Sequence, residues 1–207
     1  MGLVRKIKHH LKQNLQKDRY KHTLRVRRTA LDLIEGHVRF SSDQAKKKFR
    51  RKVSLAALLH DVDKGTDPAQ LWLKLQGDPQ VRLDDIKDSR EIWHAFSAAL
   101  TATAEFGITD PEILDALRYH STGRMGMTTL DKIIYLADYI EPGRDFPQVA
   151  EIRTAATQGI NCGCLCALEH SIAHLKTKGV KISPYTIEAR KDLLDHGIFR
   201  THPSKIK

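Results

Sequence analysis

A histidine and an aspartate stand side by side at the end of an apolar run. The segment Leu55–Leu59 contains only leucine and alanine, and His60 and Asp61 follow it directly. Burying an imidazole and a carboxylate is costly unless each finds a partner. A divalent metal ion provides one, because it binds neutral imidazole nitrogen and carboxylate oxygen alike. A hydrogen-bonded His–Asp pair at a helix end is the other interpretation, and the dipeptide alone leaves both open.

Further metal-ligating residue types occur on apolar faces elsewhere in the chain. Asp138 follows Leu130 by eight positions and Ile134 by four, which places it on the inward stripe of a predicted helix. A core salt bridge with an arginine is the common role of such a residue. Three histidines lie in comparable helical segments: His22, His94 and His120. Each alone is more often an ordinary core or surface histidine, so only the whole set indicates a metal centre.

The elements that carry these residues are predicted to be helical. Hydrophobic periodicity is close to 3.6 residues almost throughout, and alternating runs rich in Val, Ile and Thr do not occur. Helix boundaries are signalled at Gly36, Gly107, Asp110–Pro111, the pair Thr128 and Asp131, and Pro142. The expected helices cover about residues 20–35, 41–61, 71–75, 90–106, 111–120, 128–141, 147–158, 162–178 and 184–196. The fold class is therefore all-α.

In chain order the candidate ligands read H…HD…H…H…D, which resembles the HD-domain metal-dependent phosphohydrolases, an all-α superfamily. A narrower resemblance rests on longer segments. These are RYKHTLRV (19–26), LLHDVDKG (58–65), EIWHAFSAAL (91–100), GITDPEILDALRYHSTGRMGMTTLDKIIYLADYIEPGRDFP (107–147) and SPYTIEA (183–189). They are similar to the bacterial YqeK family, whose members hydrolyse diadenosine tetraphosphate symmetrically to two ADP and bind iron. The resemblance implies a single HD-domain helical bundle over residues 18–196, with the metal site between helices. A basic N-terminal extension (1–17) and a C-terminal tail (197–207) would flank it.

The resemblance also implies roles for individual residues. The principal metal ligands would be His22, His60, Asp61 and Asp138. Asp61 would bridge to a second ion if one is present, with His94 and His120 on that ion or on a substrate phosphate. Residues implied to act in catalysis are Asp61, Lys64, His94 and His120. Residues implied to contact the substrate are His22, Lys64, His94, His120, Ser121, Asp138, Arg144, Pro184, Tyr185, Thr186 and Ala189.

The expected chemistry is hydrolysis of a phosphoanhydride. A metal-bound water has its pKa drawn towards ~7, which supplies hydroxide at neutral pH. Lys64 and Arg144 would offset charge on the phosphate oxygens. Arg124, in the segment GRMG (123–126), is a further candidate, with a solvated loop arginine as the alternative. A His/Asp ligand set does not distinguish iron from manganese, cobalt or nickel. His94 and His120 are both candidates for a general acid.

The distribution of charge along the chain indicates what kind of molecule the protein binds. The 207-residue chain has a formal net charge of +10. Residues 1–52 hold 17 Lys and Arg against 4 Asp and Glu, whereas the remainder holds 18 against 21. The excess of basic residues therefore belongs to one quarter of the chain, and five of the six candidate ligands lie outside it. Two alternatives stay open: an HD-domain nucleotidase or phosphodiesterase acting on another nucleotide, and a nucleic-acid-binding module that uses the basic quarter.

Several residues of suggestive type are expected to be ordinary. Cys162, Cys164 and Cys166 form no closed disulfide framework, and their spacing prevents all three from binding one metal from a regular helix. His170 and His174 have the spacing of a histidine metal pair but lack the glutamate of an H-E-x-x-H site. Solvated histidines are expected at His9, His10, His37, His196 and His202.

No secretory signal or membrane span is expected, so a cytoplasmic location follows. Trp72 and its neighbouring leucines could form either a homodimer interface or a lid.

Overall fold

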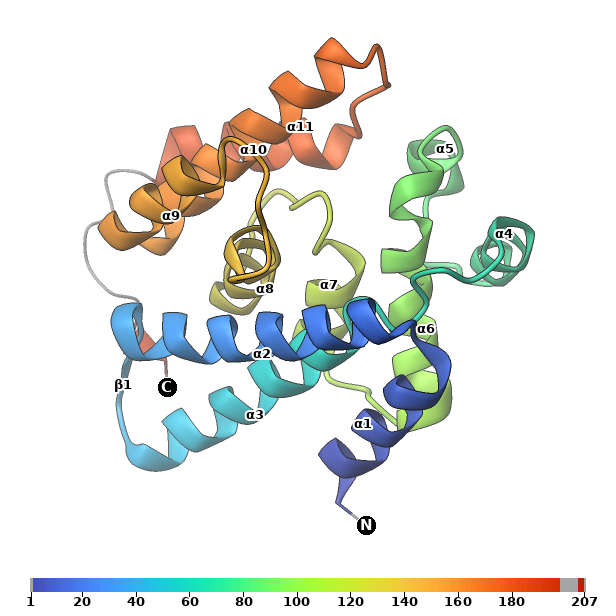
Figure 1. Ribbon diagram of the computed structural model, residues 1–207, viewed down its shortest axis with the longest axis horizontal. Coiled ribbons are helices and arrows are strands. Elements are labelled where there is room, and N and C mark those ends of the chain that lie inside the picture. The colour runs from blue at the N-terminus through green and yellow to red at the C-terminus, as the bar shows by residue number, and fades with distance from the viewer. Residues whose placement is uncertain (1, 198–204, 207) are drawn as a thin grey trace.

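The computed structural model describes residues 2–197 and 205–206. Its longer helices are α1 (Leu3–Asn14), α2 (Lys17–His37), α3 (Asp43–Leu59), α4 (Pro68–Gln76), α6 (Trp93–Phe106), α7 (Pro111–Arg118), α8 (Thr129–Ile140), α9 (Val149–Gln158), α10 (Ile160–Thr177) and α11 (Pro184–Asp192). Shorter elements are β1 (Arg39–Phe40), α5 (Leu83–Ile86), the 3-10 turn η1 (Arg90–Ile92), the π-helical turn η2 (Leu193–Gly197) and β2 (Lys205–Ile206). The all-α expectation is confirmed (Figure 1).

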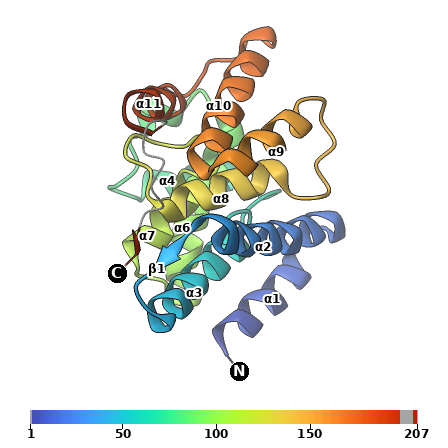
Figure 2. The same ribbon diagram turned by 90° about the vertical axis from the view of Figure 1, so that its left-hand side faces the viewer.

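The helices are stacked around α8, which lies near the middle of the molecule. Helix α2 packs on α3 and α8, while α9 and α10 pack on the other side of α8. Figure 2 shows the resulting order, with α1, α2 and α3 below α8 and with α9 and α10 above it. Helix α7 contacts α3, α6 and α8. Every helix expected to carry a candidate ligand therefore has at least one packed neighbour that carries another.

Local signals set the helix ends near the site. Gly107 adopts a left-handed conformation with φ of 66° and ends α6. The Asp110 side chain accepts a hydrogen bond from the backbone N–H of Glu112 at the start of α7. Thr128 and Asp131 form the expected capping box at the start of α8. Because these caps satisfy otherwise unpaired backbone N–H groups, they define where α7 and α8 begin.

The molecule has two clusters of buried apolar side chains. The larger one includes Val26, Leu58 and Tyr135 and receives side chains from α1, α2, α3, α6, α7, α8, α9, α10 and α11. The smaller one gathers Leu71, Leu75, Ile86, Trp93 and Phe96 with Tyr185, and it connects α4 and α5 to the start of α6. In this second cluster the rings of Trp72 and Trp93 lie 4.7 Å apart. The α4–α5 arm seen on the right of Figure 1 is thus anchored through an aromatic contact.

The structure differs from the expectations in three local features. Helix α2 continues through Gly36 to His37 instead of stopping before it, because tertiary packing outweighs the low helix propensity of a single glycine. The segment 1–17 contains α1, whose Ile7 and Leu11 are completely buried in the larger cluster. The short strands β1 and β2 pair in parallel. The domain boundaries at 17 and 197 stay predictions, and His202 lies outside the described residues.

Candidate metal centre

Six side chains from separate parts of the chain converge between the helices. His22 comes from the first half of α2, and His60 with Asp61 follows α3. His94 stands in the first turn of α6, His120 follows α7, and Asp138 lies near the end of α8. All of them are buried except Asp138, whose side chain is 15% exposed. The sequence-predicted ligand set is therefore assembled at one place.

Three of the histidines are oriented by their Nδ1 atoms. Nδ1 of His60 lies 2.9 Å from the Ala57 carbonyl oxygen, and Nδ1 of His120 lies 2.8 Å from the Leu117 carbonyl oxygen. A carbonyl oxygen can only accept, so Nδ1 must donate in both rings. In the neutral ring this leaves the Nε2 lone pair free, which is the arrangement found for histidine ligands of metals.

His22 is oriented by a carboxylate. Its Nδ1 lies 3.0 Å from Oε1 of Glu141, a residue that is only 1% exposed. The Nε2 atoms of His22 and His60 are buried and make no hydrogen bond within the described part of the chain. Burying a nitrogen lone pair without a donor is costly. The Nε2 atoms of His22 and His60 both face the carboxylates of Asp61 and Asp138, and this arrangement suits a bound cation.

Asp61 stands between two pairs of histidines. Its Oδ2 lies 3.6 Å from Nε2 of His22 and 3.4 Å from Nε2 of His60. Its Oδ1 lies 3.2 Å from Nε2 of His94 and 3.7 Å from Nε2 of His120. The two oxygens therefore face two different sets of imidazoles, which is the placement of a bridging carboxylate.

Asp138 completes the first of these sets. Its Oδ1 lies 3.0 Å from Nε2 of His22 and 4.0 Å from Nε2 of His60. Three overlapping groups have ligand atoms within 4.8 Å of one another: His22, His60 and Asp61; His60, His120 and Asp138; and Asp61, His94 and His120. Imidazole and carboxylate donors suit borderline divalent ions such as those of iron, manganese and zinc. The residues present thus fit one or two metal ions.

The electrostatics keep three of these ligands, Asp61, Asp138 and His94, in the form that binds metal. Burial opposes ionisation of Asp61, but the neighbouring imidazoles outweigh it and hold its pKa well below the usual value. Burial likewise opposes ionisation of Asp138, while His22 and Arg144 lower its pKa. Burial lowers the pKa of His94 to about 4, so that ring is neutral near pH 7. Ionised carboxylates and neutral imidazole are the required states of metal ligands.

Three cations border the cluster. Lys64 places its Nζ 3.3 Å from Nε2 of His94, and burial lowers the pKa of its ammonium group. The Arg144 guanidinium donates to the Asp138 carbonyl oxygen at 2.7 Å and to its Oδ1 at 2.5 Å. Arg19 donates to Oδ2 of Asp61 at 2.8 Å. The side chains of Arg19 and Arg144 are 34% and 33% exposed, so a positively charged rim lies where the cluster meets solvent.

The other residues predicted to contact the substrate lie at different distances from the His/Asp cluster. Ser121 Oγ lies 3.1 Å from Nε2 of His120 and therefore borders the cluster. Tyr185 packs against Tyr119, with ring centroids 5.2 Å apart, and Tyr119 directly precedes His120. Thr186 and Ala189 are buried in α11, and Pro184 begins that helix. Within residues 2–197, no hydrogen bond or ion pair joins Pro184, Thr186 or Ala189 to the six histidines and aspartates of the cluster.

Two residues of the site were not anticipated from the sequence. Glu141 orients His22 and also pairs with Arg25, whose guanidinium passes so close to Gly143 that a Cβ at that position would collide with it. Arg19 pairs with Asp61. Arg19 and His22 are three positions apart, which places them on one helix face and could have marked Arg19. For Glu141 the available signal was its place directly before Pro142 at the end of the Asp138 helix.

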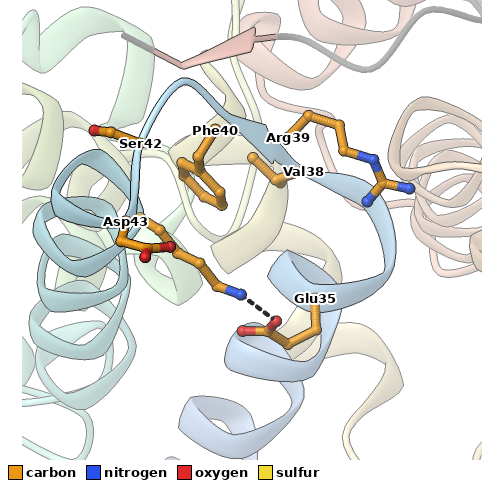
Figure 3. A pocket seen from close by; sticks show the side chains of 7 residues that line it. Glu35, Val38, Arg39, Phe40, Ser42 and Asp43 are labelled. Atoms are coloured by element: carbon orange, nitrogen blue, oxygen red, sulfur yellow. Dashed lines mark hydrogen bonds and ion pairs between the residues drawn. The ribbon is translucent and has the colours of Figure 1, made fainter.

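Other candidates lie outside the cluster. Arg124 pairs with Asp131 at 2.8 Å and stacks over Tyr119, so it anchors its loop to α8. A surface hollow between α2 and α3, shown in Figure 3, contains Glu35 beside Phe40 and Asp43. Glu35 there accepts a hydrogen bond from Lys46 at 2.7 Å, and none of the six cluster residues lines the hollow.

Comparison with known proteins identifies relatives of this arrangement. A family model described as the HD domain matches residues 19–143. The chain is 36% identical over 176 residues to a protein of Bacillus subtilis (strain 168) named bis(5'-nucleosyl)-tetraphosphatase, symmetrical, covering 85% of this chain and 89% of that one. A Staphylococcus aureus (strain NCTC 8325 / PS 47) protein of the same name is 38% identical over 153 residues, covering 74% of each chain.

A solved structure has the same architecture. It is the crystal structure of a protein described as a predicted HD superfamily hydrolase involved in NAD metabolism from Clostridium acetobutylicum. The TM-score is 0.82 and the sequence identity is 33%, with 92% of this chain and 96% of that chain covered. No described helix is long and apolar enough to cross a membrane.

Proposed function

This chain belongs to the HD-domain family, and from that premise we propose that it is an enzyme that cleaves diadenosine tetraphosphate symmetrically into two molecules of ADP. Relatives that carry the name of this activity match most of the chain. The observation within the molecule that carries the proposal is the convergence of four histidines on Asp61 and Asp138. Hydrolysis by a metal-dependent centre is the chemistry that this cluster fits.

The same geometry supports a proposal for the metal ligands. His22, His60, Asp61 and Asp138 would hold one divalent ion, and Asp61 with His94 and His120 would hold a second ion or a substrate phosphate. We propose iron, with manganese, cobalt and nickel as alternatives that the donor set also accepts. When bound, such an ion lowers the pKa of a coordinated water and so supplies a nucleophile at neutral pH.

The surrounding residues bind and orient the substrate. Lys64, beside His94, would meet the phosphate oxygens of the scissile anhydride and offset their charge. Arg144 and Arg19 form the positive rim through which a polyphosphate would enter. Since burial lowers the pKa of His94 to about 4, this ring acts as a ligand or acceptor near pH 7 and not as a proton donor. ADP leaves as a phosphate oxyanion, so a general acid is not essential.

We propose that the nucleoside contacts lie next to His120. Ser121 hydrogen-bonds with that histidine, and Tyr119 connects it to Tyr185 at the start of α11. We propose that Ser121 and the first turns of α11, with Pro184, Tyr185, Thr186 and Ala189, contact the nucleotide. Their position next to His120 through Tyr119 supports this assignment.

We also propose three further properties. A cytoplasmic location would suit a substrate of this kind. A homodimer could use Leu73, which is 72% exposed beside Trp72. Binding of nucleic acid would use the basic residues of α3, of which Lys47, Lys48 and Arg51 are exposed. Steep salt dependence of binding to RNA or DNA would reveal that last activity.

Product analysis tests the main proposal. The protein is purified with its native metal, the metal per chain is measured, and the products from diadenosine tetraphosphate are separated by chromatography. We expect ADP as the sole nucleotide product. A mixture of ATP and AMP would contradict symmetrical cleavage, and turnover of mononucleotides alone would favour a nucleotidase. Retention of full activity after complete metal removal would contradict the role of the cluster.

A further inference from the structure

Metal-ligating residue types recur along one side of α10. Cys162, Cys166, His170 and His174 are spaced four residues apart, and α10 covers all of them as one helix. Positions four apart lie one above the other on a helix surface. Cys166 and His170 therefore point from successive turns towards the same side. All of these residues are at least partly exposed, so the stripe faces solvent.

A third ligand type reaches this stripe from the neighbouring helix. Nε2 of His170 lies 2.9 Å from Oε2 of Glu151, which belongs to α9. The ligand atoms of Glu151, Cys166 and His170 all lie within 4.8 Å of one another. An ordinary surface ion pair explains the contact between His170 and Glu151. It does not explain why a thiol stands at the same point.

The spacing suits a small divalent ion. Zinc bonds of ~2.0–2.3 Å in a tetrahedral site place ligand atoms about 3.3–3.8 Å apart. Only modest side-chain rotation would bring thiol, imidazole and carboxylate to that spacing, and Glu151, with a side chain 67% exposed, is free to rotate. A sulfur ligand favours zinc and related borderline or soft ions over magnesium or calcium.

We propose that Glu151, Cys166 and His170 form a second metal site for zinc or a related divalent ion, with water in the remaining position. The site is independent of the His/Asp cluster, which contains no thiol and lies on other helices. Burial, together with the negative charges of Glu151 and Glu169, raises the pKa of the Cys166 thiol. The free thiol is therefore protonated at neutral pH, and each ion bound releases one proton from it.

The proposed Glu151–Cys166–His170 site would join α9 to α10, two helices that pack on the Asp138 helix. Helices α9 and α10 both pack on α8, the helix that carries Asp138, as Figure 2 shows. An ion held by one residue of α9 and two of α10 would tie these helices together. Because a ligand that binds only the folded state stabilises it, zinc should raise the melting temperature of the protein.

Cobalt titration tests the site in the full-length protein with its His/Asp cluster already loaded. Thiolate bound to Co²⁺ has an intense near-ultraviolet charge-transfer absorption, which nitrogen and oxygen ligands do not produce. We expect this absorption to saturate at one Co²⁺ per chain in the wild type and to disappear on addition of excess Zn²⁺. Absence of the absorption in the wild type would overturn the proposal.

Three variants assign the ligands. Cys166→Ser should abolish the absorption, and His170→Gln should weaken cobalt binding at least about tenfold, because each removes a direct ligand. Cys162→Ser is the matched control, since Cys162 lies on the same stripe but outside the group, and it should bind like the wild type. Persistence of the absorption in Cys166→Ser, or its loss in Cys162→Ser, would overturn the assignment. Each variant's circular dichroism spectrum checks that the helices remain.

Thermal unfolding gives a second readout that does not depend on a spectrum. Added Zn²⁺ should raise the melting temperature of the wild type and of Cys162→Ser but not that of Cys166→Ser. An equal rise in all three proteins would place the stabilising zinc elsewhere and contradict the site. Hydrolysis of diadenosine tetraphosphate by Cys166→Ser should match the wild type, because Cys166 belongs to no part of the catalytic cluster.

Discussion

Glu141 accepts a hydrogen bond from Nδ1 of His22 over 3.0 Å, although 119 positions separate the two residues. The same carboxylate pairs with Arg25 and accepts from the backbone N–H of Gly143 at 2.6 Å. Burial opposes ionisation of Glu141, but the hydrogen bonds from Arg25 and His22 outweigh it and lower its pKa to about 2. Glu141 is therefore an ionised acceptor that holds Nε2 of His22 towards Asp138.

Replacing Glu141 should weaken metal binding without removing a ligand. In Glu141→Gln the amide accepts less strongly, so His22 loses orientation and basicity, and we expect metal affinity to fall about 10–100-fold. The measurement is metal content after dialysis against a graded chelator. Glu35→Gln, which alters an acid of α2 that pairs with Lys46 and Arg50, should keep wild-type metal content. An unchanged metal affinity in Glu141→Gln would show that His22 does not need this partner.

Replacing Asp61 should remove both metal and turnover. Its two oxygens face all four histidines, so Asp61→Ala leaves either metal group without its shared carboxylate. We expect loss of bound metal and a fall in kcat of several orders of magnitude, with helicity retained. Near-normal turnover in this variant would contradict the metal assignment.

Asp63 provides the matched control for that experiment. Asp63 follows Asp61 by two positions and is also buried. Its carboxylate accepts hydrogen bonds from Ser97, Thr101 and Lys74 and faces none of the cluster residues. Asp63→Asn should lower the free energy of unfolding by about 1–3 kcal/mol and keep the metal. Loss of metal from both variants alike would mean that the effect of Asp61→Ala is structural.

Lys64 is expected to act on phosphate and not on the metal. Its Nζ lies near His94 at the edge of the cluster, within reach of a bound anion. Lys64→Ala should keep its metal while kcat/KM for diadenosine tetraphosphate falls at least about a hundredfold, as expected when a charge-stabilising group is lost. Metal analysis and steady-state kinetics on the same preparation make the distinction. A parallel fall in metal content would assign Lys64 a structural role.

Cys164 should make stability depend on pH in the alkaline range. The side chain is fully buried, and burial raises the pKa of its thiol to about 12 from an ordinary value of 9.0. Between these values the unfolded chain loses a proton that the folded chain keeps. The stabilising contribution is therefore complete below pH 9 and falls by about 1.4 kcal/mol for each pH unit above it.

Urea unfolding at pH 8 and pH 10 checks this linkage. The loss of stability between the two values should be smaller by about 1.4 kcal/mol in Cys164→Ala than in the wild type. The comparison within each protein removes the constant effect of the cavity that the substitution creates. Equal losses in the two proteins would contradict a raised thiol pKa. Labelling with a thiol reagent at pH 8 should likewise modify Cys164 only after unfolding.

Local structure near the site was predictable because its causes are local. The cap at Asp110, the capping box of Thr128 and Asp131, and the left-handed Gly107 each depend on residues within a few positions of one another. The same holds for the inward stripe that carries Asp138. The resemblance to the HD-domain family then indicated which polar residues on these helices belong together, and the structure brings all six of them to one place.

Other features could not be predicted because they depend on packing between distant segments. Glu141 follows an apolar helix and precedes a proline, a setting in which most glutamates are solvated. Only the packing of α2 on α8 buries it against His22 and Arg25. Ile7 and Leu11 likewise become core residues only because α1 packs against the other helices.

The sequence by itself determined the helical periodicity, the helix caps and the six histidines and aspartates that can bind a divalent ion. The tertiary structure decided how these groups face one another: that Asp61 divides its oxygens between two histidine pairs, that carbonyl oxygens orient His60 and His120, and that Glu141 orients His22. Helix formation is governed by neighbours a few positions apart, whereas the direction of a lone pair depends on contacts made only when separate helices pack.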